Sequence, residues 1–198
     1  MNNINIRLEE PRDYRAVEEL TRAAFHKPDR VERSKIDCPM EHWMVHMLRQ
    51  RDGIMELSFV AEMDGEIVGH IIYSHSHVVQ PDGTAIPVVN FGPISVLPKY
   101  QRKGIGGALM RHSIEAAKAQ GHGAIFFYGH PEYYPRFGFV EAKEYGVTTK
   151  DGKNFPAFMG MELKDGYLKG VTEKFVESDI YDDNLNREAV KEFDTTFR

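Results

Sequence analysis

A basic, glycine-rich turn is the segment of this sequence best suited to chemistry. It reads Gln101-Arg102-Lys103-Gly104-Ile105-Gly106-Gly107, and it joins an apolar run ending in Val96-Leu97 to an amphipathic stretch. A turn that opens a helix leaves backbone N–H groups without intrahelical partners at the positive end of the helix dipole. Glycine lets an anion approach the backbone closely, and the two cationic side chains attract it. The segment therefore predicts a site for a pyrophosphate group.

Two familiar phosphate-binding loops do not match this turn. A Walker A loop ends in Gly-Lys-Ser/Thr, where this chain has Gly106-Gly107-Ala108. The dinucleotide-binding fingerprint needs a glycine at the position that Leu109 occupies. What remains is Gln-x-x-Gly-x-Gly after an apolar strand, which resembles the acyl-CoA signature of the GNAT family of N-acetyltransferases.

A second segment strengthens this resemblance. Tyr133-Tyr134-Pro135-Arg136-Phe137-Gly138-Phe139 resembles the family's Tyr-x-x-x-Gly-Phe motif, at the expected distance downstream. The segment that begins at His130 also resembles a bacterial subgroup of predicted acetyltransferases. This resemblance does not indicate a substrate. The resemblance covers about residues 4–163 of the chain.

The resemblance implies that the chain uses acetyl-CoA as acyl donor. The strand that ends at Val96 would hydrogen-bond the pantetheine arm through its backbone, and the glycine-rich turn would hold the pyrophosphate. The cofactor-binding residues implied in this way are Ser95, Val96, Leu97, Gln101, Arg102, Lys103, Gly104, Ile105, Gly106 and Gly107.

The implied reaction is direct attack of a neutral primary amine on the thioester in a ternary complex. Tyr134 matches the family's general acid, which protonates the departing thiolate, and a backbone N–H near Val96 would stabilise the oxyanion. Tyr134 could instead be only a packed aromatic residue beside Phe137 and Phe139.

The general base is left unassigned by the sequence. Many members of the family carry a glutamate on the central strands, but Val88 to Val96 contains no carboxylate. The candidates Glu62, Glu132, His75 and His77 are better explained as solvated or hydrogen-bonded surface residues, so none is chosen as the base. His42 and His46 share a helix face, but Trp43 stands where the zinc-protease pattern needs a glutamate, so we expect no metal.

Composition narrows the classes of function. The formal net charge is −5, which argues against a nucleic-acid partner, and Cys38 is a lone cysteine. The sequence shows neither a signal-peptide plan nor a long apolar run, so we expect a cytoplasmic protein without a membrane partner. Two functions other than acetyl transfer are left open by the sequence. The protein could be a noncatalytic acyl-CoA-binding or sensing module, or an interaction protein. The acceptor amine is not identified, and a homodimer is left open.

Periodicity predicts the elements that position these motifs. Strands are expected over residues 4–8, 57–63, 67–79, 86–97, 124–128, 139–142 and 158–163, with a hairpin at Asp64-Gly65 and a bulge at Gly92-Pro93. Helices are expected over 11–25, 41–49, 105–121 and 186–193.

The expected fold class is α/β: a GNAT-type mixed, mostly antiparallel sheet with a splayed central strand pair and helices on both faces. We expect an N-acetyltransferase domain over residues 1–163. Residues 164–198 would form a C-terminal extension, either a lid or dimer arm or a segment docked on a sheet edge.

Overall fold

The computed structural model describes residues 4–26 and 38–197, and its contacts group them into two compact units. The first unit contains the described residues of Met1–Ile72, Pro93–His112 and Asp179–Arg198. The second unit contains Tyr73–Gly92 and Ser113–Ser178. Two strands, β3 (Glu66–Val79) and β4 (Ala85–Val96), and helix α4 (Ile105–Ala119) contribute residues to both units.

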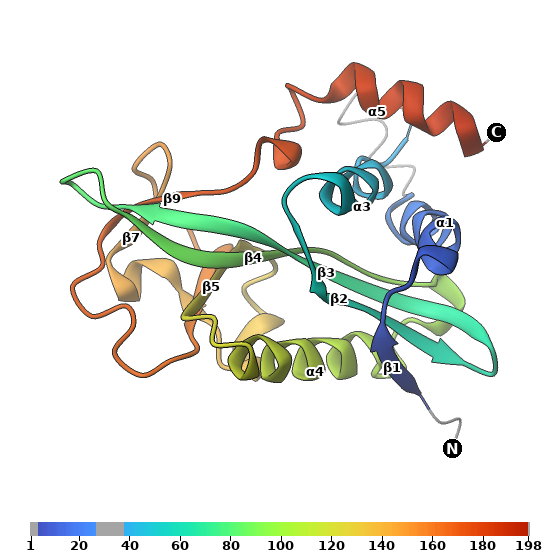
Figure 1. Cartoon of the computed structure of the whole chain (residues 1–198), viewed down its shortest axis with the longest axis horizontal. Coiled ribbons are helices and arrows are strands. Elements are labelled where there is room, and N and C mark those ends of the chain that lie inside the picture. Colours follow the sequence, from blue (N-terminus) through green and yellow to red (C-terminus); the bar gives the residue numbers. More distant parts are fainter. Residues whose placement is uncertain (1–3, 27–37, 198) are drawn as a thin grey trace. The chain divides into compact units, whose positions relative to one another are not determined.

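Nine strands among the described residues are hydrogen-bonded into a mixed sheet (Figure 1). The order is β1 (Asn5–Leu8), β2 (Gly53–Met63), β3, β4, β5 (Ala124–Tyr128), β8 (Phe158–Glu162) and β6 (Val140–Glu141). β9 (Glu173–Val176) pairs with β3 and with β7 (Val147–Thr149). The pairs β1–β2, β3–β9, β5–β8 and β6–β8 are antiparallel, whereas β4–β5 and β7–β9 are parallel. This arrangement confirms the predicted mixed, mostly antiparallel sheet.

The parallel contact between β4 and β5 is short. Its ladder consists of one pair in register, Val89 with Ile125. The next residues of β4 include Gly92, with a φ of 150°, and Pro93, which has no N–H to donate. A one-pair ladder agrees with the predicted splayed central pair.

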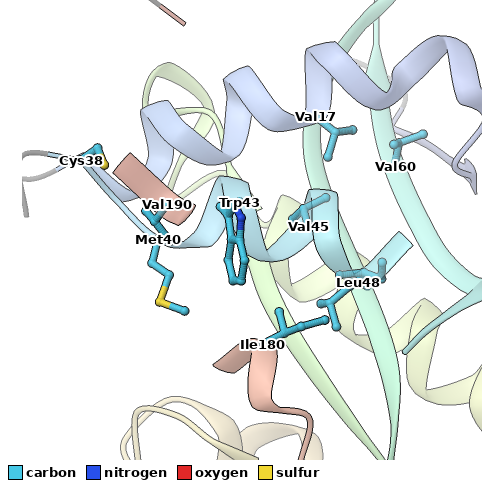
Figure 2. Close-up of a cluster of buried hydrophobic side chains, with 10 residues drawn as sticks. Val17, Cys38, Met40, Trp43, Val45, Leu48, Val60, Ile180 and Val190 are labelled. Carbon is cyan, nitrogen blue, oxygen red and sulfur yellow. The ribbon is translucent and has the colours of Figure 1, made fainter. Parts of the chain in front are cut away.

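Helices cover both faces of the first unit's strands. Helices α1 (Tyr14–Phe25) and α3 (Glu41–Gln50) lie against each other, and Val60 of β2 belongs to the hydrophobic core that they share (Figures 1 and 2). The neighbouring Phe59 points to the opposite face, as alternation in a strand requires, where its ring lies 4.7 Å from His112 of α4. On the same side, Ile105 and Leu109 of α4 approach Gly69 of β3.

The C-terminal residues are built into both units. Residues up to Ser178, β9 among them, belong to the second unit, and the later ones return to the first. There Ile180, in the 3-10 turn Asp179–Tyr181, and Val190, in helix α5 (Arg187–Asp194), join the core around Trp43 (Figure 2). Arg22 of α1 donates to Asp194 over 2.6 Å. The predicted domain boundary between residues 163 and 164 stays a prediction.

The second unit has an interior dominated by aromatic rings. Phe126 of β5 packs on one face with Phe158 and Phe175, whereas the neighbouring Phe127 lies 4.2 Å from Phe91 of β4 on the other. Sequence periodicity did not predict β7 and β9, which are only 3 and 4 residues long. The irregular segment predicted between His26 and Pro39 falls mainly on residues 27–37, outside the described residues.

Candidate active site

The glycine-rich turn forms the helix entrance that the sequence predicts. Arg102 and Gly104 both adopt left-handed backbone, with φ of 61° and 88°, and α4 begins at Ile105. The first helical N–H to find its acceptor within this turn is that of Ala108, which donates to the carbonyl of Gly104 over 2.9 Å. The N–H groups of residues 105–107 precede it and have no intrahelical acceptor, because they lie in the first turn. N–H groups in this position, at the start of a helix, are of the kind that bind anions in proteins.

The charge on this turn is uncompensated. Residues 101–104 are exposed, and neither Arg102 nor Lys103 has an ion pair with any described residue. The Nζ atom of Lys103 lies 5.0 Å from the centre of the Tyr100 ring. Lys99, by contrast, is paired with Glu66 at 2.7 Å. Arg102 and Lys103 are therefore the cations of this turn that are available to a phosphate.

At the end of β4, the backbone N–H and C=O groups of Val96 point away from β3. The N–H of Leu97 donates to the carbonyl of Val68 on β3 over 2.9 Å. Since N–H and C=O of a trans peptide point in opposite directions, the carbonyl of Val96 faces away from β3, where it accepts from Nε2 of Gln101 over 3.0 Å. The side chain of Ser95 is buried and hydrogen-bonds Thr21 of α1 at 2.9 Å. Of the three predicted strand residues, Val96 is the one directed outward.

Tyr134 lies in the second unit, in the short 3-10 turn Tyr134–Phe137 that follows β5. Its side chain is buried, and its ring is 4.6 Å from that of Phe127 and 5.8 Å from that of Phe91. Burial, with a smaller contribution from Tyr133, raises the pKa of Tyr134 to about 12. The hydroxyl is therefore protonated at neutral pH and can donate a proton or a hydrogen bond.

Gly129 makes room for the ring of Tyr134, a role that the sequence did not reveal. A Cβ at this position would lie 2.4 Å from Cε2 of Tyr134 and 2.5 Å from Cε2 of Phe127. Its N–H donates to the carbonyl of Ala157 over 2.8 Å, which holds the backbone in place. Glycine fits here without displacing a neighbour, because the rings of Tyr134 and Phe127 occupy the space that a Cβ would need.

None of the four candidate bases weighed from the sequence stands out in the structure. Glu62 accepts from Arg7 at 3.1 Å, Glu132 and His75 are exposed, and His77 is half-buried. Glu177, which follows β9 in the acidic C-terminal stretch, differs from all of them. It accepts a hydrogen bond of 2.7 Å from Asn90 of β4, and burial raises its pKa to about 7. No sequence signal marks it, since its burial comes from strands distant in the chain.

Among residues 4–26 and 38–197, no group of three or more His, Cys, Asp and Glu side chains is arranged to hold a metal ion. In the same ranges, no helix has both the length and the apolar character that crossing a membrane requires.

Comparison with known proteins adds independent support. The GNAT acetyltransferase domain model matches residues 5–142. An uncharacterized N-acetyltransferase of Escherichia coli K12, YhbS, is 30% identical over 168 residues, which is 84% of this chain and 92% of that protein.

Solved structures agree with the family match. The crystal structure of E. coli YhbS in complex with CoA matches with a TM-score of 0.75 and 25% identity, covering 91% of this chain and 93% of that one. A GNAT acetyltransferase from Brucella melitensis in complex with acetyl-CoA matches with a TM-score of 0.67 and 25% identity, covering 92% and 100%. These findings confirm the predicted fold and enzyme class. The chain belongs to the GNAT family of N-acetyltransferases.

Proposed function

We propose that this protein transfers an acetyl group from acetyl-CoA to a primary amine. The observation that carries the proposal is the helix entrance at residues 101–107. There the N–H groups of residues 105–107 have no intrahelical acceptor, and Arg102 and Lys103 have no ion pair with any described residue. This surface fits a pyrophosphate, and relatives have been crystallised with CoA and with acetyl-CoA. The chemistry that acetyl-CoA supplies is an activated acyl group on a sulfur that leaves readily.

Different residues of the chain bind the acyl donor and protonate the leaving group. Backbone N–H groups of residues 105–107 bind the pyrophosphate, with Arg102 and Lys103 adding charge. The backbone N–H of Val96 hydrogen-bonds the acyl donor, because the Val96 carbonyl is already held by Gln101. Tyr134, protonated at neutral pH, donates its proton to the leaving sulfur.

The proposal is tested first by CoA binding. At 100 times Kd, a ligand that binds only the folded state adds about 2.7 kcal/mol, which corresponds to a rise in Tm of roughly 5–10 °C for a chain of this size. Gly106→Val should abolish the rise, because its β-branched side chain blocks the approach of the phosphate. Ala119→Val, at the exposed far end of α4, is the matched control and should respond like the wild type.

Catalysis is then tested by thiol release from acetyl-CoA in the presence of polyamines, amino acids, aminoglycosides and short peptides. An unchanged Tm at millimolar CoA would refute the donor assignment. Binding without thiol release with any of these amines would instead favour a noncatalytic acyl-CoA sensor.

A further inference from the structure

Glu177 and Asn90 bring a half-buried carboxylate against the central strand of the second unit. The Nδ2 atom of Asn90, whose side chain is buried, donates to Oε2 of Glu177 over 2.7 Å. Glu177 has no ion pair with any described residue, so this carboxylate is held by an amide and not by a cation. Such a group keeps its capacity to take up a proton, because no positive charge holds it ionised.

The position of Asn90 relates this carboxylate to Tyr134. Asn90 and Phe91 are consecutive in β4, so their side chains point to opposite faces of the strand. Phe91 contacts the ring of Tyr134, with the two ring centres 5.8 Å apart. Glu177 and Tyr134 are thereby placed on opposite faces of one strand. An acyl transfer needs one group that removes a proton from nitrogen and another that protonates sulfur, and this arrangement provides two separate groups.

The surroundings of Glu177 suit proton uptake at neutral pH. Burial raises its pKa to about 7, and the hydrogen bond from Asn90 opposes this shift only in part. The titratable group that faces it from β5 is Tyr128, whose pKa is raised by burial and by the charge of Glu177. A proton acceptor works best when its pKa lies near the operating pH.

Tyr128, whose pKa the negative charge of Glu177 helps to raise, belongs to an exposed aromatic pair. Tyr128, 41% exposed, stacks on Phe155, 40% exposed, with ring centres 5.8 Å apart and planes inclined by 17°. Aromatic faces attract organic cations, and a carboxylate beside them supplies the opposite charge. This combination suits an ammonium group attached to an apolar or aromatic body.

We propose that Glu177, oriented by Asn90, takes the proton from the ammonium group of the acceptor, and that Tyr128 and Phe155 bind the acceptor's apolar body. The inference rests on the proposed function. Glu177 accepts one N–H proton and later releases it to water, which leaves a neutral amine. The amine nitrogen then forms a bond to the acyl carbon, the carbon–sulfur bond breaks, and the sulfur takes the proton of Tyr134. The second proton lost from nitrogen restores Tyr134, so one proton is released per turnover.

One arm of the test needs no known acceptor. The full-length protein, saturated with CoA and labelled with ¹³C at its glutamate carboxyl carbons, is titrated by NMR, and Glu177→Gln identifies the signal of Glu177. We expect a midpoint near pH 7 that falls when phenethylammonium is added. A midpoint below about pH 5, close to that of an ordinary glutamate, would overturn the proposal.

The second arm compares two acceptors of nearly the same shape. Phenethylamine is protonated at pH 7, whereas O-benzylhydroxylamine, which has oxygen in place of one CH₂, is neutral. Glu177→Gln should lower kcat/KM for phenethylamine by about 10²–10⁴-fold and remove the acidic limb of its pH profile. The loss for O-benzylhydroxylamine should be less than about tenfold, because that amine needs no initial deprotonation.

The control variant is Glu173→Gln, which removes another carboxylate of β9 and should behave like the wild type. Equal losses for both amines would show that Glu177 has only a structural role. If neither amine is acetylated, the NMR midpoint decides. The CoA-induced rise in Tm must persist in Glu177→Gln, and its absence from the wild type would mean that the proposed function itself fails.

Discussion

Two carboxylates, Glu9 of the first unit and Glu177 of the second, have different partners, and their pKa values are shifted in opposite directions. In the first unit, Arg49 of α3 donates to both Glu9 and Glu18, at 2.5 and 2.8 Å. Burial alone would raise the pKa of Glu9, but His70 and Arg49 lower it to about 2. In the second unit, Glu177 has an amide partner only, and its pKa rises to about 7.

This difference shows that the neighbouring charge, more than burial, decides what a buried carboxylate can do. Glu9, which follows β1, stays ionised across the physiological range and is held by Arg49 of α3 and by Ser58 of β2, which donates to it over 2.7 Å. Arg49 also binds Glu18 and so connects this network to α1. Glu177 can exchange a proton at neutral pH. The first arrangement holds structure together, and the second is suited to a reaction.

The largest effect is expected from breaking the charge network of the first unit. Arg49→Ala would remove the guanidinium that two buried carboxylates share, and should cost about 3–5 kcal/mol of unfolding free energy in urea titrations. Arg51→Ala is the control, because Arg51 makes an exposed pair with Asp179 at 2.8 Å and should cost about 0–1 kcal/mol. Similar losses for the two variants would show that the network does not stabilise the first unit.

In the second unit, removing one hydroxyl should change activity and leave stability nearly unaltered. Tyr134→Phe should lower kcat about 10²-fold, equivalent to about 2.7 kcal/mol of activation free energy, because the hydroxyl acts on the leaving sulfur. The ring contacts with Phe127 and Phe91 are retained. The readout is thiol release with an accepted amine, and the half-buried neighbour Tyr133 changed to Phe is the control. Unchanged turnover from pH 6 to 9 would mean that Tyr134 is only a packing residue.

Adding one methyl group beside the same ring should disturb both stability and activity. Gly129→Ala places a Cβ 2.4 Å from Cε2 of Tyr134, and such overpacking costs about 1–3 kcal/mol. We expect a lower unfolding free energy together with reduced turnover, because the hydroxyl of Tyr134 is displaced. Shortening Phe127 to Leu in the same variant should recover part of the activity. Wild-type turnover in Gly129→Ala would show that the position of the ring is not critical.

The smallest expected effect is on the pH dependence of stability, in which Glu177 and Glu9 should differ in sign. The folded-state pKa of Glu177 lies above the unfolded value of 4.5, so its contribution to stability is present below pH 4.5 and is lost as pH rises towards 7. Glu177→Gln should therefore match the wild type near pH 4.5 and exceed it by about 1–2 kcal/mol at pH 8. The full pKa shift corresponds to about 3.4 kcal/mol, and solvent reduces this value because Glu177 is only half-buried. Glu9 has the opposite sign, because stability from its ionised form is lost as pH falls from 4.5 towards 2.

Urea unfolding at pH 4.5 and pH 8 measures this difference. A gain of the same size at both values would show that Glu177 does not titrate in this range.

Local signals in the sequence predicted the elements that depend on local backbone geometry. The hairpin at Asp64-Gly65 is present with φ of 51° and 80°, and α4 begins directly after Gly104. The turn that carries Tyr134 ends in Gly138, whose backbone is left-handed with a φ of 97°. These features follow from residue type, because glycine, proline and aspartate restrict or release φ and ψ wherever they stand.

The sequence by itself determined the family, the mixed sheet and the glycine-rich turn that opens α4, because short motifs and periodic patterns encode each of them. Only the tertiary structure decided that β9 pairs with β3 and that Gly129 makes room for Tyr134. It also decided that Glu177 meets Asn90. The pKa of a carboxylate depends on desolvation and on the charge of its neighbours, and both are set by residues far away in the chain. The roles of Glu9 and Glu177 therefore follow from their surroundings and not from their residue type.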